Sequence, residues 1–406
     1  MVEKELCLPL FAPEHNYIAH NLVLPLPVFV RDIPFDGIIL TQTFLSRRRD
    51  PRYYRQACAD YSFIQESPAF KIALPQDDYD CCAILDRWLV DWKVDLVYPV
   101  CDHWDVLYPQ CLTSSRLKQG YTGYISDQLL ERARNPKATS RRPIDVSYRA
   151  AKLLPNFGRL GYLKGTIGER FGRAAAGQGL VLDLSTDTIV GSKWLDFIED
   201  SKAMLGVNSG SSLLDPEGLV NSKVQQYLLR HPQASFEEVE AACFPGMDGQ
   251  YVLTAVSPRN FECSLLQTTQ VLTPGPYSNM LRPWEHYIPL EPDMSNLGEV
   301  LPVLKDHRHM ETVATRCKEQ ILSFPELRYG NHVADLIGEI QEGTRISSAD
   351  RAAGVPLFER YREEMAALEP AFWRRERLRR KTHELLVGAG ARRVKYLLVD
   401  LFGRSG

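Results

Sequence analysis

The sequence predicts an α/β protein with two doubly wound domains in tandem and a helical tail. At 406 residues the chain is too long for one ordinary core, so two domains are expected. Short apolar strands alternate with helical segments, a basic stretch without periodicity interrupts this alternation, and the alternation then restarts. We therefore expect domains at 1–140 and 141–341, followed by a basic helical tail at 342–406.

The first domain contains three apolar strands that alternate with helical segments. We expect strands at 37–40, 71–76 and 94–100, and helices at 53–66 and 81–92. Because helices separate the strands, a parallel sheet covered by helices is predicted. The polar stretch 132–143 has two prolines and no periodicity, and we interpret it as the linker between the domains.

The second domain repeats this pattern with more strands. We expect strands at 144–150, 180–185, 203–207, 270–273 and 287–290, and amphipathic helices at 219–230 and 236–243. From residue 297 to nearly residue 390 the pattern is helical. Ligands of doubly wound sheets bind beyond the carboxyl ends of the strands, so the cleft between the two domains is the expected ligand site.

The composition limits the classes of function. A net charge of −3 argues against a dedicated nucleic-acid-binding protein. No apolar run is long enough to span a bilayer, and the N-terminus lacks the pattern of a secretory signal, so a cytoplasmic protein is expected. The nine cysteines include no C-x-x-C pair, which indicates reduced thiols and no zinc site.

Three polar stretches follow strands of the second domain, where a ligand is expected. They supply glycines, hydroxyls, cations and one carboxylate, the groups that bind a diphosphate attached to a ribose. The candidate donor-binding residues are Gly158, Arg159, Lys164, Asn208, Ser209, Gly210, Ser211, Arg259, Asn260 and Glu262. The G-x-G-x-x-G fingerprint after a strand and the P-loop signature are both missing, which favours a nucleotide-sugar site over a hydride-transfer enzyme or a P-loop NTPase.

Arg259 and Glu262 lie at the start of a predicted helix. The exposed N–H groups of a helix start suit an anion, and a carboxylate there can accept hydrogen bonds from ribose hydroxyls. The alternative is a capped surface helix, with Ser257 as the N-cap and Pro258 in the first turn.

The stretches "GRLGYLKG" (158–165) and "PRNFECSLLQTTQVL" (258–272) resemble motifs of glycosyltransferases of the GT-B fold, which have two facing Rossmann-like domains. The first is similar to the G-R-L-x-x-x-K-G stretch of the large retaining family, glycosyltransferase group 1. The second is similar to the R-x-F-E stretch of the spore-maturation-protein-like (CgeB-like) family. The resemblance covers about residues 141–340 and implies that Arg159 and Lys164 contact the donor diphosphate and Glu262 the ribose.

This resemblance implies a metal-independent glycosyltransferase without a cofactor. It would move a sugar from a nucleoside diphosphate donor, such as a UDP-sugar, to a hydroxyl-bearing acceptor. Two residues depart from the family pattern: Thr254 replaces a second glutamate of retaining relatives, and Thr269 replaces a glycine before the strand. The alternatives are a catalytically inactive sugar-nucleotide-binding or scaffolding relative and a GT-B sugar-nucleotide epimerase.

In the first domain, Asp77 and Asp78 directly follow the strand "KIAL" and are candidates for the base that deprotonates an acceptor hydroxyl. We prefer Asp78, because alternation along an extended segment points it to the cleft and Asp77 away from it. The alternative is an N-cap of helix 81–92 by Asp78 or Asp80. His103, after the next strand, is the other catalytic candidate.

Three further predictions concern single residues and the tail. Tyr277 and His286, with Glu285, are expected from their position alone to line the donor-sugar pocket. His20 is taken as a surface histidine, and the alternative is that it faces the cleft. The basic tail has an apolar stripe consisting of Leu378, Leu385, Leu386, Leu397 and Leu398. We favour packing of this tail on the first domain, and peripheral contact with an anionic membrane is the alternative.

Overall fold

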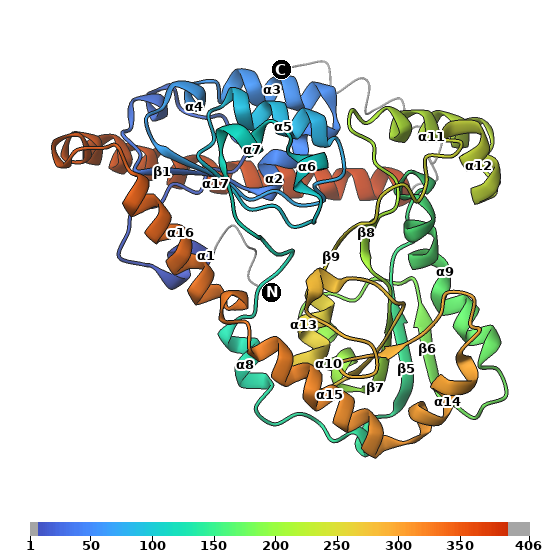
Figure 1. Ribbon diagram of the computed structural model, residues 1–406. Helices are drawn as coiled ribbons and strands as arrows, with labels where there is room; N and C mark the ends of the chain where they lie inside the picture. The colour runs from blue at the N-terminus through green and yellow to red at the C-terminus, as the bar shows by residue number, and fades with distance from the viewer. Residues whose placement is uncertain (1–6, 389–406) are drawn as a thin grey trace. The chain divides into compact units, whose positions relative to one another are not determined.

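The computed structural model describes residues 7–388 and divides into two units. Unit 1 joins the chain up to Tyr17 with Asp36–Arg345, and it contains both parallel sheets. Unit 2 joins Ile18–Phe35 with the chain from Ile346 onward. The α/β class with two parallel sheets is confirmed (Figure 1).

The first sheet has four parallel strands in the order β1-β2-β3-β4. Its strands are β1 (Gly37–Leu40), β2 (Phe70–Ala73), β3 (Leu96–Val97) and β4 (Arg116–Leu117). The helices between them are α2 (Gln42–Leu45), α3 (Pro51–Asp60), α4 (Phe63–Glu66), α5 (Cys82–Asp91), α6 (Trp104–Leu107) and α7 (Cys111–Ser114). The expected helix 53–66 is therefore two helices, and the strand at 94–100 is shorter than predicted.

Burial explains why β2 lies inside this sheet and why α5 covers it. All four residues of β2 are buried, as expected for a parallel strand with helices on both faces. Helix α5 turns Leu85, Trp88 and Leu89 inward at helical spacing, and all three are fully buried.

The second sheet has five parallel strands in the order β11-β10-β7-β5-β6. Its strands are β5 (Ile144–Arg149), β6 (Leu182–Ser185), β7 (Ser201–Gly206), β10 (Thr269–Leu272) and β11 (Ile288–Pro289). Strand β6 lies beside β5 at one edge of the sheet. Strand β7, which follows β6 in the chain, lies on the other side of β5. The carboxyl ends of β5 and β7 are therefore the switch point at which such sheets bind ligands.

Helices pack on both faces of the second sheet (Figure 1). One core includes residues of α9 (Gly158–Ala174) and α14 (Leu297–Lys305). The other includes residues of α8 (Asp127–Arg132), α10 (Ser192–Glu199), α13 (Pro258–Leu265) and α15 (His307–Leu322). The start of α9 follows β5, and Arg259 in the first turn of α13 contacts the last residue of β5, so both helices begin on the side where a ligand is expected.

Two stretches that were expected to be loops are regular structure. "GRLGYLKG" forms the first two turns of α9, which is stabilised by burial of Ile167 and Phe171. Ser209–Ser211 is strand β8, which pairs antiparallel with β9 (Leu253–Ala255). Between these two strands lie the amphipathic helices α11 (Leu219–Arg230) and α12 (Phe236–Cys243), both as predicted.

The first and second domains contact each other within unit 1. Helix α16 (Tyr329–Gly343) follows the second domain and packs Leu336 against the core of the first sheet. Arg87 of α5 forms an ion pair with Glu217, which precedes α11, with Nη1 2.8 Å from Oε1. Asp215 accepts a backbone hydrogen bond from Cys81 at 3.1 Å. The loop before α5 is thereby tied to the second domain.

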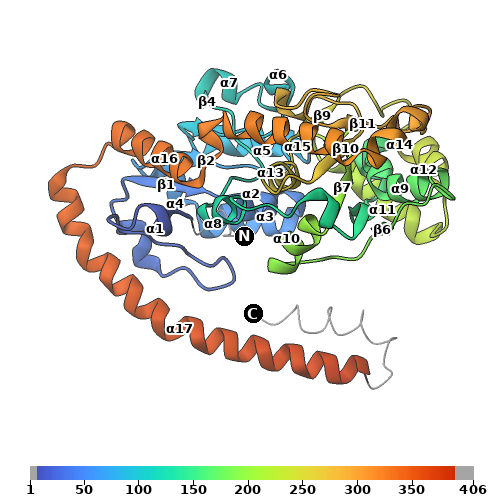
Figure 2. The same ribbon diagram turned by 90° about the horizontal axis from the view of Figure 1, so that it is seen from below.

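Unit 2 consists of the 3₁₀ turn η2 (Val28–Asp32) and the long helix α17 (Ser348–Gly388), which Figure 2 shows as a single continuous helix. Up to residue 379, where the structure describes side chains, Tyr361 and Met365 are the buried hydrophobic residues of this helix, and the His20 ring nitrogen Nδ1 lies 2.9 Å from the Tyr361 hydroxyl. His20 is therefore half-buried within this unit, and the prediction of a surface histidine is wrong.

The basic tail can be compared with its prediction only in part. Leu378 is 65% exposed, whereas the side chains of Leu385 and Leu386, and all of Leu397 and Leu398, lie outside the described part of the chain. Within residues 7–388, no helix has both the length and the apolar character needed to cross a bilayer. Packing of the tail and its contact with a membrane stay predictions.

Candidate functional site

Arg259 lies at the carboxyl end of β5, at the switch point of the second sheet. It occupies the second position of α13, after the predicted N-cap Ser257 and Pro258. Its Nη2 donates a hydrogen bond to the carbonyl oxygen of Arg149, the last residue of β5. Its guanidinium carbon lies 5.6 Å from the ring centre of Tyr148. Backbone and aromatic contacts therefore hold this cation in place without a carboxylate.

Lys164 is the second cation at this place. It lies in the second turn of α9, and its backbone carbonyl accepts a hydrogen bond from the Tyr148 hydroxyl at 2.7 Å. Burial lowers the pKa of the Lys164 ammonium, the neighbouring Arg259 lowers it further, and the Asp77 carboxylate raises it. Among residues 7–388, no carboxylate forms an ion pair with Lys164 or Arg259. Cations that are not held in ion pairs are the groups that bind a diphosphate, and contact of these two with a donor stays a prediction.

Glu262 provides the carboxylate of the site. Its side chain is 8% exposed, and its Oε2 accepts a hydrogen bond of 2.7 Å from the indole Nε1 of Trp194. Burial raises the pKa of Glu262, while the hydrogen bond from Trp194 and the charge of Arg259 lower it. Within the described residues, Oε1 has no hydrogen-bond partner, so it can accept a hydrogen bond from a ligand hydroxyl.

The first domain contributes Asp77, from the loop after β2. Buried Arg48 holds this loop by donating hydrogen bonds to four carbonyl oxygens, those of Leu45, Gln76, Asp77 and Asp80. The Asp77 side chain is 41% exposed, and its Oδ2 lies 2.8 Å from Nη2 of Arg49. A rigid loop thus presents a solvent-accessible carboxylate near Lys164.

The prediction that Asp78 points to the cleft is wrong. Asp78 is 0% exposed, and its Oδ2 accepts hydrogen bonds from the backbone N–H groups of Val100 (2.8 Å) and Cys101 (3.3 Å). Burial raises the pKa of Asp78 to about 6. The loop is not extended, because Asp77 has a φ of 52°, and this left-handed residue exchanges the directions of the two side chains.

The alternative cap of α5 is wrong as well. The N-cap of α5 is Cys81, in a left-handed conformation and without a side-chain capping bond. Asp80 instead lies with Oδ2 2.8 Å from Nε of Arg49.

The side chain of Arg159 does not join Lys164 and Arg259 at the switch point, because carboxylates of the second domain hold it elsewhere. Its guanidinium lies 3.0 Å from Glu240 and 3.4 Å from Glu237, both on α12, and its backbone N–H donates to the Asp248 carboxylate at 3.1 Å. Gly158 has a φ of 67°, and a Cβ at this position would clash with Asp248 Oδ1 and Ser212 Oγ. The carboxylate of Asp248 thus lies at the N-terminus of α9, and contact of Arg159 with a diphosphate stays a prediction that these ion pairs do not support.

The stretch 208–211 is not the free loop that we expected. Ser209 and Ser211 pair with Ala255 and Leu253 in the β8–β9 ladder. The Ser211 hydroxyl donates to the carbonyl oxygen of Leu213 at 2.7 Å, and Asn208 is buried with Nδ2 3.3 Å from the Pro274 carbonyl. Gly210 adopts a φ of 147° in this ladder. Contact of these four residues with a donor stays a prediction.

Three other candidates make structural hydrogen bonds. Asn260 donates from Nδ2 to Gln270 at 2.7 Å, and the Tyr277 hydroxyl donates to the Thr273 carbonyl at 2.7 Å. His286 is buried, its Nδ1 accepts from the backbone of Arg282 at 3.1 Å, and burial lowers its pKa. All three side chains are buried, so a donor-sugar contact stays a prediction that these bonds do not support.

His103 has a different environment from the other candidates. It is exposed, it has a φ of 65° before α6, and its ring centre lies 6.3 Å from that of Tyr251. Tyr251 belongs to the second domain, so His103 lies where the two domains approach each other.

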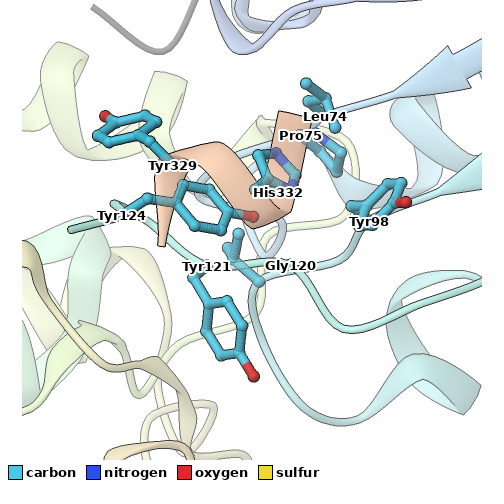
Figure 3. A pocket seen from close by; sticks show the side chains of 9 residues that line it. Leu74, Pro75, Tyr98, Gly120, Tyr121, Tyr124, Tyr329 and His332 are labelled. Carbon is cyan, nitrogen blue, oxygen red and sulfur yellow. The ribbon is translucent and has the colours of Figure 1, made fainter. Parts of the chain in front are cut away.

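An aromatic pocket at the carboxyl ends of β2 and β3 was missed from the sequence (Figure 3). Its lining consists of Leu74, Pro75, Tyr98, Val100, Gly120, Tyr121, Tyr124, Tyr329 and His332. The rings of Tyr124 and His332 stack with 4.0 Å between their centres. The Thr122 hydroxyl donates to the Val256 carbonyl at 2.6 Å, so this pocket lies next to the start of α13. The tyrosines of "GYTGY" (120–124) were the available signal.

Trp194 was also missed, because no motif surrounds it. No group of three or more histidine, cysteine or acidic side chains within the described residues is arranged to hold a metal ion.

No protein-family model and no curated protein matches the sequence. Among solved structures, the chain is similar to trehalose-6-phosphate synthase OtsA, with a TM-score of 0.42, 10% identity, and coverage of 77% of this chain and 72% of that one. The N-terminal domain of Candida albicans trehalose-6-phosphate phosphatase has a TM-score of 0.41 and 9% identity, covering 76% and 70%. Anabaena HepE, in complex with UDP-glucose, has a TM-score of 0.36 and 12% identity, covering 75% and 78%. TM-scores below 0.5 carry no argument about the activity of this chain.

Proposed function

We propose that this protein is a glycosyltransferase of the GT-B type. It would move a sugar from a nucleoside diphosphate donor, with a UDP-sugar as the first candidate, to a hydroxyl-bearing acceptor. The observation that carries the proposal is the grouping of Lys164, Arg259 and Glu262 at the switch point of the second sheet. Two cations without a carboxylate partner and a carboxylate with one open oxygen match a diphosphate and a ribose.

The charges of this site suit the departure of a nucleoside diphosphate. Negative charge builds up on the diphosphate as the bond to the sugar breaks, and preorganised cations stabilise that charge most strongly where water is excluded. Lys164 and Arg259 would supply this stabilisation, and we propose that no metal ion is required. The open oxygen of Glu262 would accept a hydrogen bond from the ribose and thereby position the donor.

Of the two aspartates, we propose Asp77 as the base of an inverting reaction. Its carboxylate is accessible and lies near Lys164, whereas the carboxyl group of Asp78 is fully buried. A base must come within hydrogen-bond reach of the acceptor hydroxyl, which a buried carboxyl cannot do.

A second candidate function is supported by the environment of Arg159. Its pairing with Glu237, Glu240 and Asp248 leaves one of the two cations implied by the family resemblance unavailable to a phosphate. A sugar-nucleotide-binding relative without transferase activity would be compatible with this arrangement.

A thermal-shift screen followed by an activity assay tests both functions. A ligand at 100 times its Kd stabilises the folded state by about 2.7 kcal/mol, so the correct nucleotide raises the melting temperature. UDP, GDP, ADP and dTDP and their glucose conjugates are screened with the native protein, with Lys164→Met, and with Lys305→Met as a control at an exposed lysine of α14.

The proposal expects a shift for one nucleotide that Lys164→Met abolishes and Lys305→Met retains. Release of the nucleoside diphosphate from the matching nucleotide sugar identifies a transferase, and binding without release identifies the non-catalytic relative. No shift with any nucleotide would refute both functions.

A further inference from the structure

Arg259 and Glu262 are three residues apart on α13, so their side chains emerge on the same side of the helix. Opposite charges at this spacing attract each other and commonly pair. These two residues form no ion pair, although both are half-buried or buried and Arg259 lowers the pKa of Glu262. Something in the site therefore keeps the two charges apart.

Trp194 of α10 contacts both of them. Its indole N–H donates to Glu262 Oε2 at 2.7 Å, and its ring centre lies 5.4 Å from the guanidinium carbon of Arg259. An indole has a positive edge at its N–H group and a negative face, so one side chain can satisfy a carboxylate and a guanidinium at the same time.

The remaining contacts keep each charge in its separate position. Arg259 is held toward β5 by its hydrogen bond to the Arg149 carbonyl and by the ring of Tyr148, 5.6 Å away. Trp194 itself is half-buried, and its ring centre lies 6.0 Å from that of Phe197 on the same helix. The indole thus contacts both charged groups, one at its N–H edge and one at its ring.

We propose that Trp194 is a positioning residue that prevents Arg259 and Glu262 from neutralising each other. Arg259 then keeps its charge for the diphosphate, and Glu262 keeps an open carboxylate oxygen for the ribose. This inference rests on the proposed function for its role in binding, but the separation of the two charges is a property of the protein alone.

Two variants separate the two contacts of the indole. Trp194→Phe keeps an aromatic face for Arg259 and removes the N–H donor to Glu262, whereas Trp194→Leu removes both. Trp373→Phe is a matched control, because Trp373 also donates its indole N–H to a glutamate, Glu369, at 3.3 Å, on α17.

Calorimetry with UDP, 2′,3′-dideoxy-UDP and inorganic pyrophosphate measures the effect on binding. Trp194→Phe is expected to weaken UDP about 10-fold, the usual scale for a hydrogen bond to a charged group, and to leave the other two probes unchanged. Trp194→Leu is expected to weaken the binding of all three probes, and Trp373→Phe is expected to leave the binding of all three unchanged. Native affinity for UDP in both Trp194 variants would overturn the proposal.

A double-mutant cycle tests the separation of charges without a ligand. Arg259→Gln and Glu262→Gln are combined in the native protein and in Trp194→Leu, and urea unfolding reports their stabilities. A small favourable coupling is expected in the native protein, where Arg259 lowers the pKa of Glu262 without pairing with it. A larger coupling is expected in Trp194→Leu, where the two charges are free to pair. Equal coupling in both backgrounds would overturn the proposal. If native protein binds none of the probes, the proposed function fails, and this cycle alone decides the role of Trp194.

Discussion

Replacing Asp78 by asparagine is expected to remove a pH dependence of stability without removing activity. The carboxyl group is fully buried, and its pKa is raised by burial from 3.8 to about 6. The folded protein therefore holds the proton of Asp78 more tightly than the unfolded chain does. This contribution to stability is fully present below pH 3.8 and is lost as the pH rises through about 6.

The size of the effect follows from these two pKa values. Protonation of Asp78 contributes on the order of 1 kcal/mol at pH 5 and almost nothing at pH 7, because one pKa unit corresponds to about 1.36 kcal/mol. Asparagine cannot be protonated in this range, and its amide oxygen can still accept a hydrogen bond from the Val100 N–H. From pH 7 to pH 5, the free energy of unfolding of native protein should thus rise by on the order of 1 kcal/mol relative to that of Asp78→Asn.

Urea unfolding of both proteins at pH 5, 6 and 7 measures this difference. Other titrating groups are common to both proteins and cancel when the two unfolding free energies are subtracted. We also expect Asp78→Asn to retain sugar transfer, since a buried side chain cannot reach an acceptor. A difference that stays constant from pH 5 to pH 7, or a loss of transfer with native stability, would refute the buried, structural role of Asp78.

The other predictions concern the donor site and the base. Lys164→Ala should weaken the binding of UDP and of pyrophosphate by about 10-fold or more. Arg159→Ala should change either affinity by less than about threefold, because the Arg159 guanidinium is already paired. Equal losses of affinity in the two variants, measured by calorimetry, would contradict this. Glu262→Gln should weaken UDP but not 2′,3′-dideoxy-UDP, and an equal loss for both would make Glu262 a structural residue. Asp77→Asn should slow transfer by about 10²-fold with donor affinity nearly native, and normal turnover would remove Asp77 from the mechanism. EDTA should leave transfer unchanged, and a loss that manganese restores would refute the metal-independent mechanism.

Patterns that depend on neighbouring residues could be predicted from the sequence. The strands 37–40 and 144–150 were found as short segments between turn or helical stretches. The helices 219–230 and 236–243 were found from hydrophobic periodicity, because burial of one helix face sets the spacing of the apolar residues. The start of α13 was found from Ser257 and Pro258, because capping is a contact between adjacent residues.

Local reasoning failed where a contact with a distant segment overrides a local preference. Glycines 158, 161 and 165 suggested a loop, yet α9 forms through them, and Gly168 of the same helix packs closely against the Tyr148 ring of β5. "NSGSS" looked like a turn until its pairing with Leu253–Ala255, more than forty residues later, made it a strand.

The candidate site divides in the same way. The residue types of the site could be predicted from the sequence, because a diphosphate attached to a ribose requires cations and a carboxylate. Lys164, Arg259 and Glu262 were all named in this way. Their grouping with Trp194 and Asp77 depends on how β5, α9, α10 and α13 pack together. The sequence also could not show that Arg159 is paired with carboxylates of α12, or that a left-handed Asp77 turns Asp78 into the core. The direction of a side chain is set by backbone dihedrals and by neighbours from distant segments, and spacing along the chain carries neither.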